Sequence, residues 1–187
     1  MHSIKFEILI LTLLGGVIFG LAHWFNDLIF RLFEFSDHVN WIYLPAFLRL
    51  ANVLILGPLF GSISTAVGVW LICFFQNDLL SVALLNSLAG ILGPLLSFRV
   101  FTIFKGRAAQ ISFIQDLLIL AAIYSVMNAL THHLAWAIGE PEEFLSISQI
   151  PIMVFGDFIG ACLGALLFSA IANNSKILNF VKKRAED

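Results

Sequence analysis

The sequence predicts an all-α protein built as a polytopic bundle in a membrane. Of its 187 residues, 60% are hydrophobic and only 12% are charged, whereas a soluble domain carries about twice that charged fraction. The mean hydropathy is +0.97, and the apolar residues form long uncharged runs instead of alternating with polar ones. We therefore expect about six transmembrane helices, one interfacial amphipathic helix and no second domain.

The N-terminal half predicts three of these helices. The first apolar run, about residues 6–25, lacks a small-residue cleavage site and is interpreted as a retained span, not a signal peptide. Residues 26–40 place charged and large apolar side chains at spacings of three and four, which is typical of an amphipathic helix in the membrane interface. Two more spans are expected over about 41–56 and 62–75, separated by a turn at Gly57-Pro58.

The C-terminal half predicts three longer helices, over about 79–104, 111–138 and 150–172, with an acidic turn before the last one. A single bundle domain then covers residues 1–172, and residues 173–187 form a short basic tail. Eight basic residues would be cytoplasmic if both termini lie inside, against Arg31 alone on the other side; they are Lys5, Arg99, Lys105, Arg107, Lys176, Lys182, Lys183 and Arg184. This asymmetry predicts a multi-pass protein of the cytoplasmic (inner) membrane with both termini cytoplasmic.

The last apolar run carries three glycines four residues apart, Gly156, Gly160 and Gly164, next to the acidic Asp157. On a helix these glycines line one face, the pattern by which membrane helices approach each other closely. A carboxylate beside such a face is costly unless a polar group meets it, so we expect partners from the other helices.

Polar residues of four predicted helices fall in one layer of the outer half of the bundle. At about 1.5 Å per residue, Arg49 lies roughly 12 Å, Asp157 roughly 10 Å and His132 roughly 9 Å below the outer helix ends. Asn86 and Asn128 fall at similar depth. One hypothesis is an outward-facing ligand pocket with an Arg49–Asp157 ion pair and a protonatable His132. The other is a structural network that fixes helix order.

Several function classes are disfavoured by the sequence. It contains no Ser-His-Asp set, Gly-rich phosphate loop or paired-carboxylate motif, and a net charge of −2 gives no basic field for nucleic acid. A haem site would need two histidines facing across the bundle, such as His23 and His132, and we do not favour it. Cys73 and Cys162 have no metal-site spacing. We expect no enzyme activity, no metal and no cofactor.

Four short motifs carry a family resemblance: Trp41-x-x-x-Pro45, the helix segment 85–93, the segment 116–122, and Phe155-Gly156-Asp157-x-x-Gly160. Over about residues 40–172 the chain resembles the membrane-associated sensor domains of the first MASE type. The resemblance implies an integral membrane sensory domain, typically joined to a cytoplasmic kinase or cyclic-dinucleotide-making module. Those domains usually have more helices, and a glycine that they carry after the Trp-Pro motif is replaced here by Ala46 and Phe47.

No output module follows residue 172, so we expect a stand-alone, truncated sensor domain that passes any signal to a separate protein. The leading hypothesis is a non-enzymatic sensor-like or accessory subunit in signal transduction. Its partners would be the lipid bilayer and another membrane protein or a second copy of the chain. The alternative is a small-solute or proton-coupled transport component that uses the same polar cluster.

The charge asymmetry generates a labelling prediction. In a background without cysteines, single cysteines at Asp78 and Glu142 should react with an impermeant thiol reagent added outside cells, whereas one at Arg107 should not. Labelling is read by mass shift on intact cells and on opened membranes. The reversed pattern would overturn the orientation.

Overall fold

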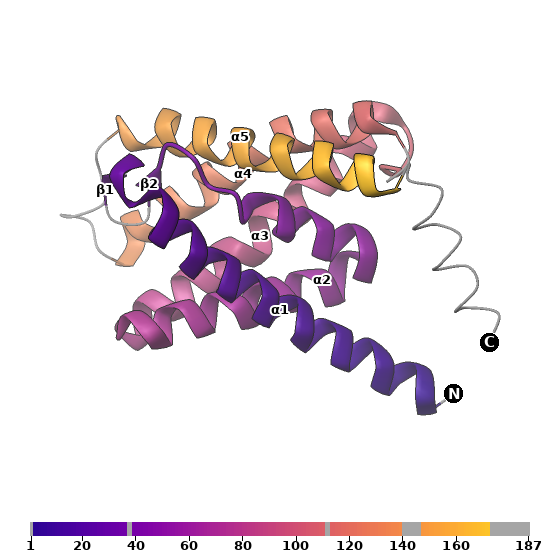
Figure 1. Cartoon of the computed structure of the whole chain (residues 1–187), viewed down its shortest axis with the longest axis horizontal. Coiled ribbons are helices and arrows are strands. Elements are labelled where there is room, and N and C mark those ends of the chain that lie inside the picture. The colour runs from indigo at the N-terminus through magenta and orange to yellow at the C-terminus, as the bar shows by residue number, and fades with distance from the viewer. Residues whose placement is uncertain (1, 37–38, 111–112, 140–146, 173–187) are drawn as a thin grey trace.

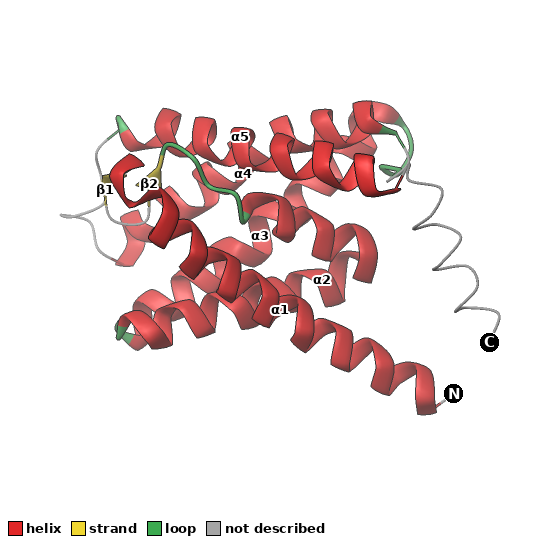
Figure 2. Ribbon diagram, in the orientation of Figure 1, coloured by secondary structure: helices red, strands yellow, loops and turns green. Residues whose placement is uncertain are grey.

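The computed structural model describes residues 2–36, 39–110, 113–139 and 147–172. Within them it is a bundle of five long helices (Figures 1 and 2): α1 His2–Phe30, α2 Ala46–Gln76, α3 Leu80–Lys105, α4 Ile114–Gly139 and α5 Gln149–Ala172. Each contains a stretch long and apolar enough to cross a membrane. The predicted all-α membrane class is therefore confirmed, while the acidic turn before α5 and the basic tail lie outside the described residues.

Helix α2 takes the place of two predicted spans, so the expected count of six is not confirmed. Its 31 residues are broken only at Gly57, whose φ of 80° and ψ of 168° are not helical. Pro58 follows directly; as the first residue after the break it needs no N–H partner, so the helix resumes without a loop. The predicted start at Trp41 was also wrong, because residues 41–45 form a connection and α2 begins at Ala46.

The break at Gly57 folds the two arms of α2 back on each other. A Cβ on Gly61 would meet the backbone of Asn52 and Val53. The Phe19 ring lies 4.9 Å from the Arg49 guanidinium carbon and also meets Gly68. In a straight helix Arg49 and Gly68 would be about 28 Å apart, too far for one ring to contact both. The two arms of α2 therefore lie side by side. As a result, α1 begins and α5 ends at the same end of the bundle (Figure 1).

The predicted interfacial helix over residues 26–40 is wrong. Helix α1 continues to Phe30, a 3₁₀ turn covers Arg31–Phe33, and two short antiparallel strands follow, β1 Glu34–Ser36 and β2 Val39–Asn40. Both β2 residues are buried and β2 packs against α5. This burial outweighs the helical charge spacing, because propensity is a weak constraint compared with tertiary packing.

The glycine face of α5 receives mainly the connection that follows β2, not a neighbouring helix. A Cβ on Gly156 would meet the carbonyl of Asn40, and one on Gly160 would meet the carbonyl of Tyr43. Only Gly164 faces a helix, through the side chain of Phe47 in α2. The Tyr43 N–H also donates to the Gly156 carbonyl at 3.2 Å. The expected close approach to the glycine face is present, but at Gly156 and Gly160 the partner is the extended segment 40–44 and not a helix.

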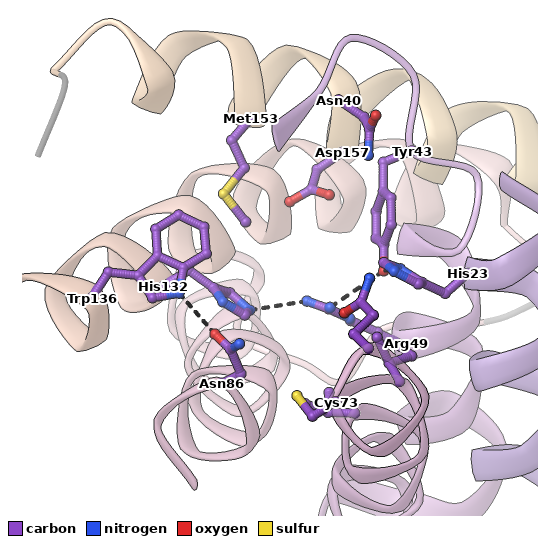
Figure 3. A pocket seen from close by; sticks show the side chains of 13 residues that line it. His23, Asn40, Tyr43, Arg49, Cys73, Asn86, His132, Trp136, Met153 and Asp157 are labelled. Carbon is purple, nitrogen blue, oxygen red and sulfur yellow. Dashed lines mark hydrogen bonds between the residues drawn. The ribbon is translucent and has the colours of Figure 1, made fainter. Parts of the chain in front are cut away.

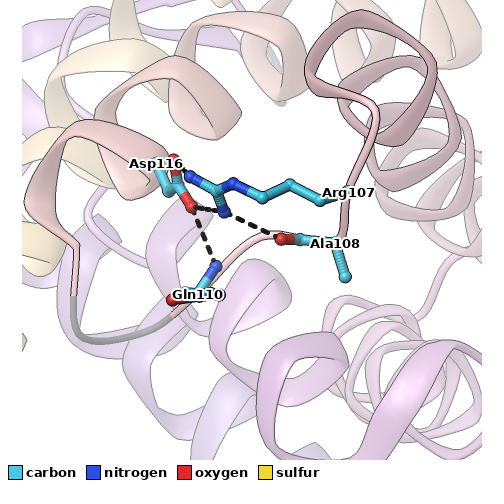
Figure 4. A network of polar contacts seen from close by, with 4 residues as sticks. All are labelled: Arg107, Ala108, Gln110 and Asp116. Atoms are coloured by element: carbon cyan, nitrogen blue, oxygen red, sulfur yellow. Dashed lines mark hydrogen bonds and ion pairs between the residues drawn. The ribbon is translucent and has the colours of Figure 1, made fainter.

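The turn between α3 and α4 is fixed by an ion pair (Figure 4). Arg107 donates to both carboxylate oxygens of buried Asp116, at 2.5 and 2.9 Å, and the Gln110 N–H donates at 3.1 Å. These contacts raise the pKa of Arg107, mainly through its hydrogen bond with Asp116. From the sequence alone, Asp116 lies near the inner end of its helix, and that position predicts Arg99 or Lys105 as its partner. Arg107 takes that role because Gly106, with φ of 66°, ends α3 and turns the chain toward α4.

The contact between Gly160 and Tyr43 generates a stability prediction. Gly160→Ala should destabilise the protein by about 1–3 kcal/mol, the usual cost of overpacking, because the Tyr43 carbonyl must move. Gly20→Ala is the matched control, since its Cβ would meet atoms of Gly68 and Leu71 at an ordinary 3.5 Å. Thermal unfolding in detergent measures both, and equal losses would contradict the proposed close contact.

Candidate functional site

A small cavity of about 50 Å³ lies between the helices (Figure 3). Its polar lining comes from all five helices and the connection before α2: His23, Asn40, Tyr43, Arg49, Asn86, His132 and Asp157, among others. A water needs roughly 10–15 Å³ of such volume, so the cavity has room for about three waters. All five residues of the predicted polar layer lie in or beside this cavity.

Arg49, on the first arm of α2, is the charged centre of the cluster and is only 5% exposed. Its Nη1 donates to Asn128 Oδ1 at 2.8 Å and to Tyr124 Oη at 3.4 Å, and Nη2 donates to Tyr43 Oη at 3.5 Å. The Phe19 and Tyr43 rings lie 4.9 and 5.6 Å from the guanidinium carbon, within cation–π range. The positive charge is therefore surrounded by neutral groups.

His132 completes the shell around Arg49, with Nε2 at 3.2 Å from Nη1. A guanidinium has only donors, so His132 Nε2 must accept and the ring hydrogen must be on Nδ1. Asn128 and His132 are four residues apart on α4, hence on one face of the helix, and both contact Arg49. His133 points elsewhere, with Nδ1 at 2.8 Å from the Ala129 carbonyl.

Asp157 is 2% exposed, and its Oδ2 accepts a hydrogen bond from Asn128 Nδ2 at 2.6 Å. Arg49 and Asp157, both in the described part of the chain, form no ion pair within 4.0 Å. The expected direct pair is thus wrong in its geometry. Asn128 stands between the two charges, accepting from Arg49 through its carbonyl and donating to Asp157 through its amide nitrogen. One neutral amide couples them.

A second branch leads from Arg49 toward the end of α1. Tyr43 Oη lies 3.0 Å from His23 Nδ1, and His23 Nε2 lies 3.1 Å from Asp27 Oδ2. Since Arg49 donates to the Tyr43 oxygen, the Tyr43 hydrogen goes to His23 Nδ1, and the ring hydrogen lies on Nε2. The Nε2–Oδ2 distance is within ion-pair range, although the ring is not aligned for a hydrogen bond. Burial raises the pKa of Tyr43, so its hydroxyl stays protonated.

Asn86 lies at the far side of the cavity and does not reach Arg49. Its Oδ1 accepts from the Trp136 indole N–H at 2.8 Å, which joins α3 to α4. Sequence reasoning missed Tyr43 and Tyr124, because a tyrosine in an apolar run is usually interpreted as an interfacial anchor. The spacing of four between His23 and Asp27 was a signal that could have identified the second branch.

The arrangement holds one permanent positive charge and connects it to two carboxylates through neutral side chains. Because its members are hydrogen-bonding and ionisable groups around a small cavity, the arrangement can exchange protons or water. Comparisons with protein family models, with curated proteins and with solved structures give no match for this chain.

The bridging role of Asn128 generates a double-mutant prediction. Arg49→Gln and Asp157→Asn should each cost about 3–5 kcal/mol, because each leaves the other charge buried without its counter-charge. The double variant should recover part of the loss. Thermal and denaturant unfolding in detergent provide the free energies, and strict additivity would contradict coupling between the two charges.

The same cycle in an Asn128→Leu background tests the bridge itself. We expect the coupling between Arg49 and Asp157 to decrease there, since the connecting amide is gone. The pair Arg107 and Asp116 is the matched control, because it is direct and should keep its coupling. Unchanged coupling at Arg49 in this background would contradict mediation by Asn128.

Proposed function

We propose that this chain is a non-enzymatic integral membrane subunit, sensor-like or accessory, that acts by packing against a partner membrane protein. The cluster around Arg49 is its responsive element. The observation that carries this proposal is the small polar cavity between all five helices. With room for about three waters, it suits a very small ligand and not the passage of a solute.

The cluster has the connectivity that a responsive element needs. Through Asn128 it joins α2 to α4 and α5, and through Tyr43 and His23 it joins α2 to the connection and α1. A ligand shifts a protein between states only through different contacts in each state. A change in hydrogen bonding at Arg49 alters contacts to several helices at once.

The resemblance to the first MASE type of sensor domain supports the same proposal. Its clearest motif, Gly156-Asp157-x-x-Gly160, contributes both the carboxylate of the cluster and the glycines that admit the Tyr43 segment. The cluster therefore uses the residues that carry the resemblance. We propose that the signal passes to a separate protein or to a second copy of this chain.

For orientation we propose a cytoplasmic (inner) membrane location with both termini in the cytoplasm. The start of α1 and the end of α5 lie at one end of the bundle (Figure 1). Helix α3 ends toward that end with Lys105, and Arg107 follows in the turn to α4. A bias of Lys and Arg marks the cytoplasmic side. The cavity then lies nearer the outer face.

A small-solute or proton-coupled transport component is the second candidate. The observation that favours it is the line of polar groups from half-exposed Asp27 through His23 and Tyr43 to Arg49. Intramembrane ionisable groups of this kind commonly mark ion or proton pathways.

The proposed function predicts a stoichiometric membrane partner. Mild extraction of the tagged chain at its native expression level should recover one partner protein, or a homo-oligomer, measured by quantitative mass spectrometry and native size. Asp157→Asn should retain the partner, because the cluster responds and does not form the contact surface. A lone monomer that moves a solute after reconstitution would contradict the accessory role and support transport.

A further inference from the structure

Two parts of the polar cluster line the same cavity. His23 of α1 lines one side and Asp157 of α5 lines another (Figure 3). The His23 side chain is 12% exposed, and its neighbour Asp27 is 41% exposed. A space for about three waters thus lies between a buried carboxylate and a histidine next to the protein surface.

Asp157 is held differently from the other buried carboxylate of the described chain. Asp116 is fixed as an anion by two hydrogen bonds from Arg107 and one from the Gln110 N–H. Asp157 has the Asn128 amide on Oδ2, and no arginine contacts it directly. Oδ1 is therefore the atom at which a proton can bind.

We propose that Asp157 is a proton-binding site that exchanges protons with the surface through cavity water, Tyr43 and His23. This deepens the proposed function by naming the proton as the ligand to which the cluster responds. Release proceeds in five transfers. The Asp157 carboxyl gives its proton to cavity water, and the water gives one to Tyr43 Oη as Tyr43 passes its own to His23 Nδ1.

Asp27 Oδ2 lies 3.1 Å from His23 Nε2, so a small rotation of the ring into line with the carboxylate lets His23 give its Nε2 hydrogen to Asp27. Asp27 then gives a proton to solvent. One proton moves from Asp157 to bulk water, and no electrons change. Every intermediate group is restored apart from the His23 tautomer, which resets when the ring loses its Nδ1 hydrogen to water and takes one from water at Nε2. Uptake follows the reverse sequence. An imidazole suits this relay because it accepts a proton at one nitrogen and releases one from the other.

The charged and titratable groups around Asp157 come from each neighbouring element: Arg49 and Cys73 of α2, Tyr43 of the connection, Tyr124 and His132 of α4, and His23 of α1. Helix α3 contributes Asn86, which does not titrate. Among these groups Arg49 keeps its charge throughout.

When Asp157 is protonated, Arg49 loses its nearest counter-charge and Asn128 loses a charged acceptor. Proton binding thereby alters the link between α2, α4 and α5.

Infrared spectroscopy of the full chain in phosphatidylcholine vesicles tests the site. On acidification, wild type should gain the carbonyl stretching band of a protonated carboxyl group. Asp157→Asn should lack that band, Asp157→Glu should shift its frequency, and Asp116→Asn should retain it. If Asp157→Asn does not fold, Asp157→Glu still tests the site. A band that is identical in wild type and the Asp157 variants, or no band at any pH where the protein is folded, overturns the proposal.

The relay is tested by the rate at which this band shifts after transfer into D₂O. His23→Gln should slow the shift, while His133→Gln, a buried histidine away from the cavity, should leave it unchanged. Equal rates in wild type and His23→Gln would overturn the route through His23. Partner recovery after mild extraction does not depend on these bands, so failure of the proton site and failure of the accessory role are separate results.

Discussion

The structure depends on burying the Arg49 guanidinium without direct contact to a carboxylate. A buried charge is costly unless its hydrogen-bonding groups are satisfied. Here the partners come from α4, through Tyr124, Asn128 and His132, and from the connection, through Tyr43. Each element must hold its position for Arg49 to keep these partners. One side chain thereby fixes the relative placement of α2, α4 and the connection.

Close packing and the polar cluster are two parts of one arrangement. The carbonyl of Tyr43 lies against Gly160, and the hydroxyl of the same residue accepts from Arg49. The backbone contact therefore determines how far the phenol reaches into the bundle. The segment before α2 is not a passive linker, because it fills the glycine face of α5 and contributes a side chain to the cavity.

The layer of polar residues was predictable, because the rise per residue alone gives the depth of each residue below the end of its helix. Arg49, Asn128, His132 and Asp157 were expected together, and the structure brings them together. Depth does not specify how each helix is rotated, so the direct pair between Arg49 and Asp157 was wrong. The partner of Asp116 was wrong for a related reason, since the turn at Gly106 decides which base faces α4.

The segment 26–40 failed for a different reason. Its charged residues have helical spacing, but the buried strand Val39–Asn40 and its packing on α5 are long-range contacts that no local pattern contains. No sequence motif indicates the function of the cluster either. A ligand pocket and a structural network use the same residue types, so the volume of the cavity is needed to distinguish between these two hypotheses.

The conformation of Gly57 also has a consequence for membrane insertion. Five straight spans are an odd number, which would leave the two chain ends on opposite faces of the bilayer. Because α2 reverses at Gly57, the first arm of about 11 residues, roughly 16 Å long, is only about half the hydrocarbon thickness. The segment 46–76 therefore forms a hairpin whose two ends lie at the same end of the bundle. Gly57, through its positive φ, decides at which end of the bundle α3, α4 and α5 begin.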